Sequence, residues 1–546
     1  MFAGRLIVFV AVLSSAAHAA PGAVATEHPL AAAAGAEILR DGGSAVDAAI
    51  AAAAAICVVH ASSCGIGGGG FALVHRAGGE DVALDYRERA PREATLDRFR
   101  IDGKLEPGLL RHGGLAVGVP GEVAGLVTLH RRFGRLALAR DLAPAIRLAR
   151  DGVVLRDVPH LAREIAQQAA LLAADPGLRA IFLADGGVPG PDFRVVQADL
   201  ARALESVAAD GTDAFYRGRR ADALAAAVRE RGGVLDVADL AGYRPRWRRP
   251  LRGRFHGYEI VTFPPPGSGG VVLEALGMLA RDDVTALGPG TPTTLHLLAG
   301  VMAQAFADRA RWYGDPDATT VPVAALLAPP RLATLRARLT PIAVAPTDAA
   351  LVPDHGTAHV SVVDAAGDAV AITTTINTSF GAGILVPGTG IVLNNEMDDF
   401  ALAPGVANVY GLTGAAANAL APGKRPQSSM SPTVVLDGRR PVLAVGGSGG
   451  PTIISGTLQV LLGVVAFGRS LRDAVEAPRI HDQGVGATLA VEPGVDAAAR
   501  RILERMGHRI TVLPAIGAVS AAGIDARGTP VAAGDPRKDG GAAVAR

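Results

Sequence analysis

Thr357 lies between a glycine and a strand-like segment, in the run Gly356-Thr357-Ala358-His359. A threonine hydroxyl is a weak nucleophile at neutral pH and needs a base nearby. Cleavage before Thr357 would release an α-amine with an ordinary pKa of about 7.7–8.0, so an appreciable fraction would be neutral, whereas a lysine at about 10.4 would be almost wholly protonated. A threonine before a strand is usually only a β-former, so this position by itself predicts no chemistry.

Two further groups of polar residues follow in the last third of the chain. Residues 394–400, Asn-Asn-Glu-Met-Asp-Asp-Phe, form an acidic and amide-rich stretch after the strand-like Ile391–Leu393. Residues 424–433 contain two adjacent serines, and the glycine-rich loop 446–451 comes shortly after them. Each group has a simpler explanation: a solvated turn, capping residues or a plain turn. Taken singly, none of them predicts a site.

The elements that must position these groups are strands with flanking helices. Alternating apolar residues predict a hairpin of 359–363 and 369–376 around 364–368, and further strands at 432–436 and 441–446. Helices are expected at 453–467 and 470–477. Because helices dominate the first part and strands the second, the sequence predicts one layered α/β body and not two independent domains.

The first part of the chain is mostly helical. Helices are predicted at 28–60, 136–151, 219–231, 271–281 and 290–314, whereas 316–356 lacks periodicity and is interpreted as an exposed, cleavable segment. Four glycines at 67–70 lead into a strand, Phe71–His75. A dinucleotide loop runs from strand to glycines to helix, the opposite order, so these glycines predict tight packing of chain segments.

A targeting signal is expected at the N-terminus. Arg5 precedes the apolar stretch Leu6–Leu13, and Ala17-His18-Ala19 is a suitable A-x-A cleavage site. The apolar stretch is too short for a permanent membrane helix, which favours a removed signal peptide, residues 1–19, over an uncleaved anchor. The sequence therefore predicts export, to the periplasm or to the medium.

Composition excludes several classes of function. Of 546 residues, 49% are hydrophobic and 19% charged, which is typical of a globular protein. Lys and Arg number 53 against 52 Asp and Glu, and aromatic residues are 4%, so a nucleic-acid role is not expected. The histidines are scattered without metal-ligand spacing, and no metal is predicted. Cys57 and Cys64 could close a small loop, but two buried, unpaired thiols are the favoured interpretation.

Together these features match a known family. The chain resembles the γ-glutamyl transpeptidases (glutathione hydrolases), which are N-terminal-nucleophile hydrolases. The resemblance runs from His28 nearly to Arg537 and includes the three groups above as well as the segments 37–49, 67–71, 84–91, 119–121, 264–270, 307–309 and 313–316.

The resemblance implies a four-layer αββα sandwich made from one precursor that cleaves itself between Gly356 and Thr357. The large piece would be residues 20–356 and the small piece 357–546. Thr357 would attack the Gly356 carbonyl first and, once freed, the γ-amide of a substrate. Thr375 matches the second threonine that fixes the nucleophile, and the backbone N–H groups of Gly449 and Gly450 match the oxyanion hole, which stabilises the negative oxygen of the intermediate.

A γ-glutamyl group carries a carboxylate and an ammonium at its far end, so its recognition needs both signs of charge. By resemblance, Arg87 would bind the α-carboxylate through a charge-assisted contact, with the hydroxyls of Ser428 and Ser429. Three residues match the binders of the α-ammonium: Asp399, Glu396 and Asn377.

Three positions bear on rate and access. Tyr410 lies in 404–412, which resembles a lid loop that would cover the bound group. Ala358 stands where relatives commonly have a hydroxyl residue, so the rate of self-cleavage stays open. Residues 446–450, Gly-Gly-Ser-Gly-Gly, replace a more usual Ser-Pro-Gly-Gly lead-in.

The sequence is therefore interpreted as a γ-glutamyl transferase/hydrolase without a cofactor. Glutathione or a similar amide would acylate Thr357, and water, an amino acid or a short peptide would take the acyl group. Two alternatives stay open: an acylase of the same fold acting on glutaryl β-lactams, and an uncleaved binding protein.

Overall fold

The computed structural model describes residues 22–340, 356–484 and 488–545. The predicted signal peptide, residues 1–19, lies outside the described residues, as do residues 341–355 of the predicted cleavable segment. The part of that segment before 341 contains two short helices, α15 (Val323–Leu326) and α16 (Pro329–Ala337), which the sequence did not predict. Leu326, Leu332 and Leu335 are buried there, and this burial stabilises turns that have no strong periodicity.

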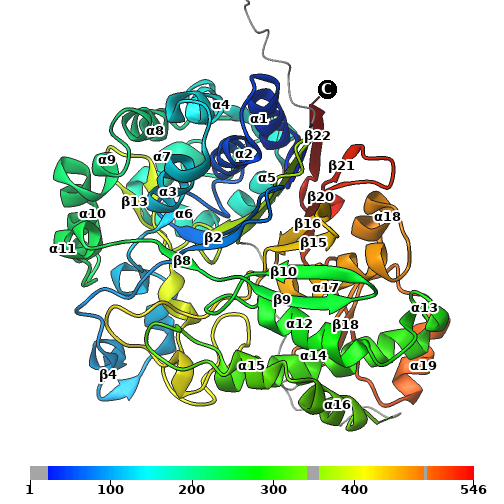
Figure 1. Ribbon diagram of the computed structural model, residues 1–546. Coiled ribbons are helices and arrows are strands. Elements are labelled where there is room, and N and C mark those ends of the chain that lie inside the picture. The colour runs from blue at the N-terminus through cyan, green and yellow to red at the C-terminus, as the bar shows by residue number, and fades with distance from the viewer. Residues whose placement is uncertain (1–21, 341–355, 485–487, 546) are drawn as a thin grey trace, which may run out of the picture.

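Two antiparallel sheets form the centre of the molecule (Figure 1). The seven-stranded sheet has the order β22 (Gly541–Ala545), β1 (Gly22–Thr26), β11 (Ala358–Asp364), β12 (Ala369–Thr375), β2 (Gly69–His75), β3 (Asp81–Tyr86) and β8 (Arg246–Arg248). The six-stranded sheet has the order β21 (Pro530–Ala533), β20 (Ala518–Ile524), β16 (Arg440–Ser448), β15 (Thr433–Asp437), β10 (Tyr258–Thr262) and β9 (Leu251–Phe255).

The two sheets pack face to face through an apolar layer. Phe71 of the first sheet stacks on Phe263, which follows β10 of the second, with ring centroids 4.2 Å apart. Leu73 and Val434 lie in the same buried cluster. Burying such side chains stabilises the fold by about 1.5–3 kcal/mol each. The inner faces of both sheets are thereby removed from water.

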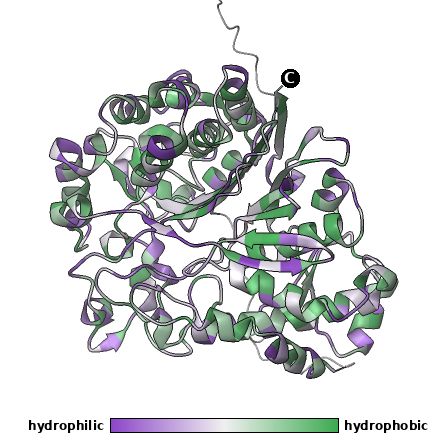
Figure 2. Cartoon of the chain, in the orientation of Figure 1, coloured by the Kyte–Doolittle hydropathy of each residue, from purple (hydrophilic) through white to green (hydrophobic). Residues whose placement is uncertain are grey.

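Helices cover the two outer faces. The seven-stranded sheet is covered by α1 (Pro29–Arg40), α2 (Ala45–Val59), α3 (Glu122–Phe133), α4 (Leu138–Asp151), α8 (Ala198–Asp210), α9 (Asp213–Tyr216), α10 (Gly218–Glu230) and α11 (Val237–Ala241). The six-stranded sheet is covered by α12 (Gly269–Leu279), α13 (Val284–Leu287), α14 (Pro292–Trp312), α17 (Thr452–Val465), α18 (Leu471–Glu476) and α19 (Ala497–Arg505). In Figure 2 the strands and α2 are largely hydrophobic and the outer helices are amphipathic. The expected four-layer αββα sandwich is confirmed.

Shorter elements lie at the margins of these layers. The helices are α5 (Pro159–Gln167), α6 (Ala169–Ala174) and α7 (Pro176–Phe182). The strands are β4 (Arg100–Ile101), β5 (Lys104–Leu105), β6 (Val153–Val154), β7 (Arg194–Val195), β13 (Leu385–Val386), β14 (Ile391–Val392), β17 (Ile480–His481), β18 (Leu489–Val491) and β19 (Ile510–Val512).

Residues 28–60, predicted as a helix, form two helices. The break falls between α1 and α2, where Gly42 has a φ of 87°. Ser44 then caps α2 by accepting from the N–H of Asp47, and Asp47 accepts in return from the N–H of Ser44. This reciprocal capping starts a new helix. Every residue of α2 is buried, so the interpretation of this stretch as a buried helix is confirmed.

Cys57 and Cys64 are bonded to each other, and the interpretation of unpaired thiols is wrong. Cys57 lies in the last turn of α2, and the chain turns back directly after it. This brings the two Cα atoms to 4.8 Å, within the range that a disulfide spans.

The glycine run packs tightly, as predicted. A Cβ atom on Gly68 would lie 2.0 Å from the carbonyl oxygen of Thr375, and one on Gly70 would lie 2.3 Å from that of Thr373. These glycines allow β2 to approach β12 closely, and β12 carries a predicted site residue at its end.

Replacing Gly68 by alanine is expected to lower the free energy of unfolding by about 1–3 kcal/mol, because the added methyl overlaps a backbone atom of β12. Gly65→Ala is the matched control, since no atom lies within 4 Å of the place that its added methyl would occupy. Thermal unfolding of the full chain measures both. Equal midpoints for the two variants would contradict the packing argument.

Candidate active site

Thr357 lies directly before β11, the strand between β1 and β12. Ala358 pairs with Thr374, so Thr357 comes opposite the end of β12 and its Oγ1 lies 3.0 Å from Oγ1 of Thr375. The N–H of Asn377 donates to the same Thr375 oxygen at 2.8 Å. Thr375 keeps its own proton and a second lone pair, so either hydroxyl of the threonine pair can be the donor. The arrangement orients the Thr357 hydroxyl.

The backbone around Thr357 is fixed on both sides. Its N–H donates to the carbonyl of Ser63 at 3.0 Å, and its carbonyl accepts from Nζ of Lys538 at 2.6 Å. Lys538 also pairs with Glu27 at 3.1 Å. Thr357 has a φ of 74°, a conformation that is strained for a β-branched residue by about 1–3 kcal/mol. The strain is therefore located at the predicted cleavage junction.

Gly356 is required by the space it occupies. A Cβ atom at this position would lie 1.7 Å from the carbonyl oxygen of Asn377. No larger residue fits before Thr357 without moving the segment that orients the threonine pair.

The Gly449–Gly450 loop connects the end of β16 to α17. Gly449 has a φ of 130° and Gly450 a φ of 52°, and added Cβ atoms would meet Thr452 at 2.2 Å and the Tyr410 ring at 3.0 Å. The loop stands at the N-terminus of a 14-residue helix, whose dipole favours negative charge. Its position next to Thr357 is suited to a developing oxyanion.

Arg87 is fully buried and hydrogen-bonds two carboxylates. One terminal nitrogen bonds Glu396, and the other bonds Asp399 at 2.5 Å and the carbonyl of Gln427 at 3.1 Å. Burial alone would lower the pKa of Arg87, but Glu396 and Asp399 raise it above its ordinary value. Burial raises the pKa of Glu396 to about 7, and Arg87 opposes this shift only in part. A guanidinium and two carboxylates therefore lie together in one largely buried part of the site.

The adjacent serines lie beside this charge cluster. The N–H of Ser428 donates to the carbonyl of Pro266 at 2.8 Å, and its Oγ accepts from the N–H of Met430 at 3.2 Å. Oγ of Ser429 accepts from Nη2 of Arg309 at 3.2 Å. The loop 264–270, which the sequence matched without a role, thus holds the serine pair.

Tyr410 closes the cavity. Its hydroxyl donates to the carbonyl of Asn377 at 2.9 Å, and the neighbouring Asn408 amide donates to Asp399 at 2.9 Å. The Asn377 side chain is itself engaged, with its amide nitrogen 3.0 Å from the carbonyl of Asn395. The cavity over Thr357 has a volume of about 20 Å³, far below the roughly 300 Å³ of the smaller ligand pockets in proteins. A substrate therefore needs the cavity to widen, and Tyr410 is one of the side chains on its wall.

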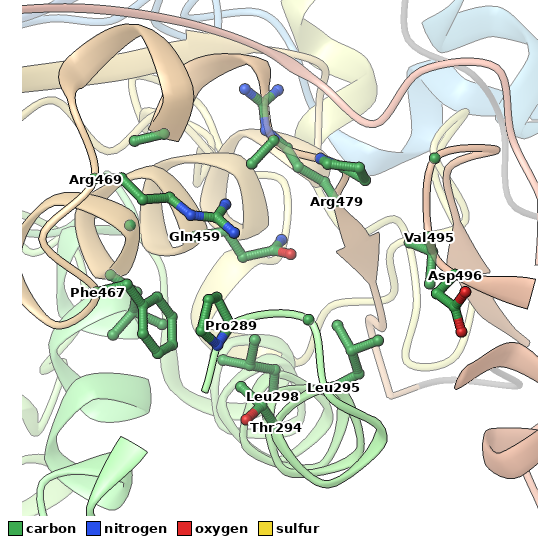
Figure 3. Close-up of a pocket in the computed structure, with 17 residues that line it drawn as sticks. Pro289, Thr294, Leu295, Leu298, Gln459, Phe467, Arg469, Arg479, Val495 and Asp496 are labelled. Atoms are coloured by element: carbon green, nitrogen blue, oxygen red, sulfur yellow. The ribbon is translucent and has the colours of Figure 1, made fainter. Parts of the chain in front are cut away.

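The structure brings ten of the eleven predicted site residues to the wall of this cavity: Arg87, Thr357, Thr375, Asn377, Glu396, Asp399, Tyr410, Ser428, Ser429 and Gly450. The eleventh, Gly449, precedes Gly450 in the loop. A roomier cavity of about 280 Å³ lies elsewhere, between α14 and α17 (Figure 3). Its wall includes Leu295, Leu298, Gln459 and Arg469 but no predicted site residue, and the hydroxyl of Thr294 there donates to the carbonyl of Gly288 at 2.7 Å. The predicted chemistry therefore belongs to the smaller cavity.

Known proteins share both the sequence pattern and the fold of this chain. The family description "Gamma-glutamyltranspeptidase" matches residues 31–545. The chain belongs to this family. It is 37% identical to a glutathione hydrolase proenzyme of Escherichia coli K12, over 94% of this chain and 90% of that protein, and 38% identical to the acylase ACY 1 proenzyme of Pseudomonas sp. SE83, over 95% and 92%. The cephalosporin acylase of Bacillus halodurans superposes with a TM-score of 0.86 at 31% identity, covering 100% of this chain and 99% of that one.

Two residues that contact this site had no predicted role, Lys538 and Arg309. Both lie in or next to segments that carried the resemblance to the γ-glutamyltranspeptidase family, 307–309 and the run ending at Arg537. A buried cation inside a matched segment was the available signal. Only the fold shows which polar atoms these cations contact.

Outside this family site, Asp47, His130 and Asp141 place ligand-type atoms within 4.8 Å of one another, a group that the scattered histidines did not predict. Burial and the neighbouring Asp47 carboxylate raise the pKa of Asp141 to about 9. At neutral pH a protonated Asp141 hydrogen-bonded to Asp47 accounts for the pair without a cation.

Binding of a ligand with an α-ammonium group, such as L-glutamate, is expected to weaken as the pH falls through about 7. Glu396 is charged above its raised pKa and neutral below it, so the attraction is present above pH 7 and approaches a tenfold loss per pH unit below it. Calorimetric titration between pH 6 and 8.5 measures the dependence. In Glu396→Gln the weakening of binding below pH 7 should be absent. An unchanged pH profile in that variant would contradict the assignment of Glu396 to the α-ammonium.

Proposed function

We propose that this chain is an exported, self-cleaving γ-glutamyl transferase/hydrolase with Thr357 as its nucleophile. The observation that carries the proposal is the placement of Thr357. Its hydroxyl is oriented by Thr375, at a glycine junction, in a cavity that contains Arg87 and two carboxylates. No cofactor takes part in the proposed route.

The first step is cleavage of the chain. Oγ1 of Thr357 attacks the carbonyl carbon of Gly356, the C–N bond breaks, and the α-amine of Thr357 takes the proton as the ester forms. Water then opens the ester and leaves a carboxylate on Gly356. The strained φ of Thr357 raises the energy of the intact junction, and the contact from Lys538 holds the Thr357 carbonyl in place while the bond breaks.

The second step is acyl transfer. The neutral α-amine of Thr357 takes the proton of its own hydroxyl, and Oγ1 attacks the γ-carbonyl of glutathione or a related amide. The N–H groups of Gly449 and Gly450 stabilise the negative oxygen, a contribution of about 2.7–4 kcal/mol for one donor in comparable sites. The leaving amine takes the proton and departs. Water, an amino acid or a peptide then takes the acyl group from Thr357.

The charges at the far end of the cavity suit a γ-glutamyl group. Arg87, with Ser428 and Ser429, would receive the α-carboxylate. Asp399, Glu396 and the Asn377 amide would receive the α-ammonium, and Tyr410 would close over the bound group. The zwitterion would replace part of the ion pairing that Arg87 makes in the closed cavity.

The mature protein would consist of residues 20–356 and 357–546. Strands of both pieces are interleaved in the seven-stranded sheet, since β1 of the large piece lies between β22 and β11 of the small piece, and β12 pairs with β2. The pieces would therefore stay associated after the cut. The N-terminal signal supports export, with the periplasm as the proposed destination. Among the described residues, no helix combines the length and apolar character needed to cross a membrane.

Sequencing the N-terminus of the smaller fragment of the purified protein is expected to give Thr-Ala-His, residues 357–359. Thr357→Ala is expected to leave one unprocessed chain without measurable turnover, because both the attacking oxygen and the future base depend on Thr357. Thr389→Ala, a buried threonine outside the cavity, is the control and should be processed normally. A fully active protein that is continuous across 356–357 would overturn the proposal.

The acylase relatives make a glutaryl amide the competing substrate. Glutaryl has the same carboxylate but no ammonium, so Asp399 and Glu396 would face it unpaired, at a cost of roughly 1–3 kcal/mol. The rate constant kcat/KM is therefore expected to be at least tenfold higher for γ-glutamyl 4-nitroanilide than for glutaryl 4-nitroanilide. Equal values, or a preference for glutaryl, would assign the chain to acylase activity instead.

A further inference from the structure

The two serine hydroxyls at the cavity wall have a fixed polarity. Oγ of Ser428 accepts from the N–H of Met430, and Oγ of Ser429 accepts from the guanidinium of Arg309. A backbone N–H and a guanidinium can only donate. In the described part of the chain, neither serine proton is given to a protein acceptor. Both protons are therefore available to a ligand, and the serine pair requires an acceptor such as a carboxylate.

Arg309 sets this polarity from a buried position. It lies near the end of α14, and its side chain is 2% exposed. Besides Ser429 it donates to Oγ of Ser268 at 3.0 Å, and Ser268 in turn donates to the carbonyl of Ser428 at 2.5 Å. One guanidinium thus holds the hydroxyl of one serine and, through Ser268, the backbone of the other.

The charge of Arg309 is not neutralised by the protein. Within the described residues no carboxylate lies within 4.0 Å of its guanidinium, whereas Arg87 hydrogen-bonds two. Burial lowers the pKa of Arg309 to about 10, with Asp399 opposing, which leaves it charged at neutral pH. A buried, unpaired cation is costly unless an anion joins it. A second small cavity is lined by both Arg309 and Asp399, and Asp399 also lines the substrate cavity, so the charge of Arg309 lies close to the substrate cavity.

We propose that Arg309 is a positioning residue for the α-carboxylate of the acyl donor: it fixes Ser429 as a hydrogen-bond donor and supplies the positive charge that the incoming carboxylate neutralises. Arg87 is paired with Glu396 and Asp399 in the closed cavity. When the α-carboxylate binds near Ser429 and Arg309, Arg87 would share it, and Glu396 and Asp399 would then face the α-ammonium. The site would therefore select acyl donors that have a carboxylate at this position. The inference rests on the proposed γ-glutamyl activity.

The test compares two anilides that differ in this one group. γ-Glutamyl 4-nitroanilide has the α-carboxylate, and 4-aminobutanoyl 4-nitroanilide lacks it; the slower substrate is followed at high enzyme concentration. Arg309→Met is expected to raise KM for the first about 10- to 100-fold, the range of a lost charge-assisted hydrogen bond, with a smaller change in kcat. On the second, kcat/KM should change less than threefold. Arg311→Met, exposed on the same helix, is the matched control and should behave as the unaltered protein.

Arg309→Lys covers the case in which the methionine variant does not fold, because it keeps a cation and is expected to recover at least part of the affinity for the carboxylate donor. The double variant Arg309→Lys with Ser429→Ala should lose little more affinity for the carboxylate donor than Ser429→Ala alone, since Arg309 acts through that hydroxyl. Equal losses on both anilides in either variant would make Arg309 merely structural and overturn the inference. Inactivity of the unaltered protein on both anilides would instead overturn the proposed function, and this inference with it.

Discussion

The hold on the backbone of Thr357 is the constraint on which the rest of the site depends. Ser63 accepts from its N–H, Lys538 donates to its carbonyl, and β11 begins with the next residue. These three attachments come from the loop after α2, the C-terminal segment and the central sheet. With the backbone fixed in this way, the hydroxyl of Thr357 lies within hydrogen-bond distance of the hydroxyl of Thr375. The layered fold therefore defines the position of a single oxygen atom.

A second constraint is the balance of buried charge. Two guanidinium groups and two carboxylates, Arg87, Arg309, Glu396 and Asp399, surround the cavity. Burial raises the pKa of the adjacent Glu88 well above its ordinary value, and the neighbouring Glu396 carboxylate adds to this shift. Removing one charge from such a set leaves its partner buried and unpaired, which is costly. A ligand that brings one charge of each sign preserves the balance, and this favours a zwitterion over a simple anion.

Much of the fold was predictable from local patterns. The hairpin at 359–376, the tight glycine run and the αββα class rest on period-two alternation, on the lack of Cβ atoms and on the family resemblance, and all three agree with the structure. Residues 28–60 were predicted to be helical and are so on both sides of Gly42-Gly43, but a glycine pair in an apolar stretch does not by itself show that one helix ends and another begins. The disulfide was missed, because seven residues of sequence separation do not reveal how sharply the chain turns after α2.

The residues that line the site were predictable from the sequence, but the residues that hold them in place were not. Residues such as Arg87 and Asp399 belong to dense motifs, so resemblance places them in one site before any coordinates exist. Lys538 and Arg309 act through contacts with a backbone carbonyl and with serine hydroxyls that are distant in sequence. Patterns of residue types do not encode which lone pair a donor occupies. Only the packing of α14 and of the C-terminal segment against the loops shows it.

Strands from both sides of the 356–357 junction are interleaved in one sheet. This has a consequence for how the protein folds. A sheet with strands from both pieces forms readily while the pieces are still joined, because the link holds them at a high effective concentration. Once the link is severed, the same sheet would have to assemble from separate partners whose encounter depends on dilution. The intact precursor would thus act as its own folding template, and the separated fragments of the proposed mature enzyme would not readily rebuild the same sheet.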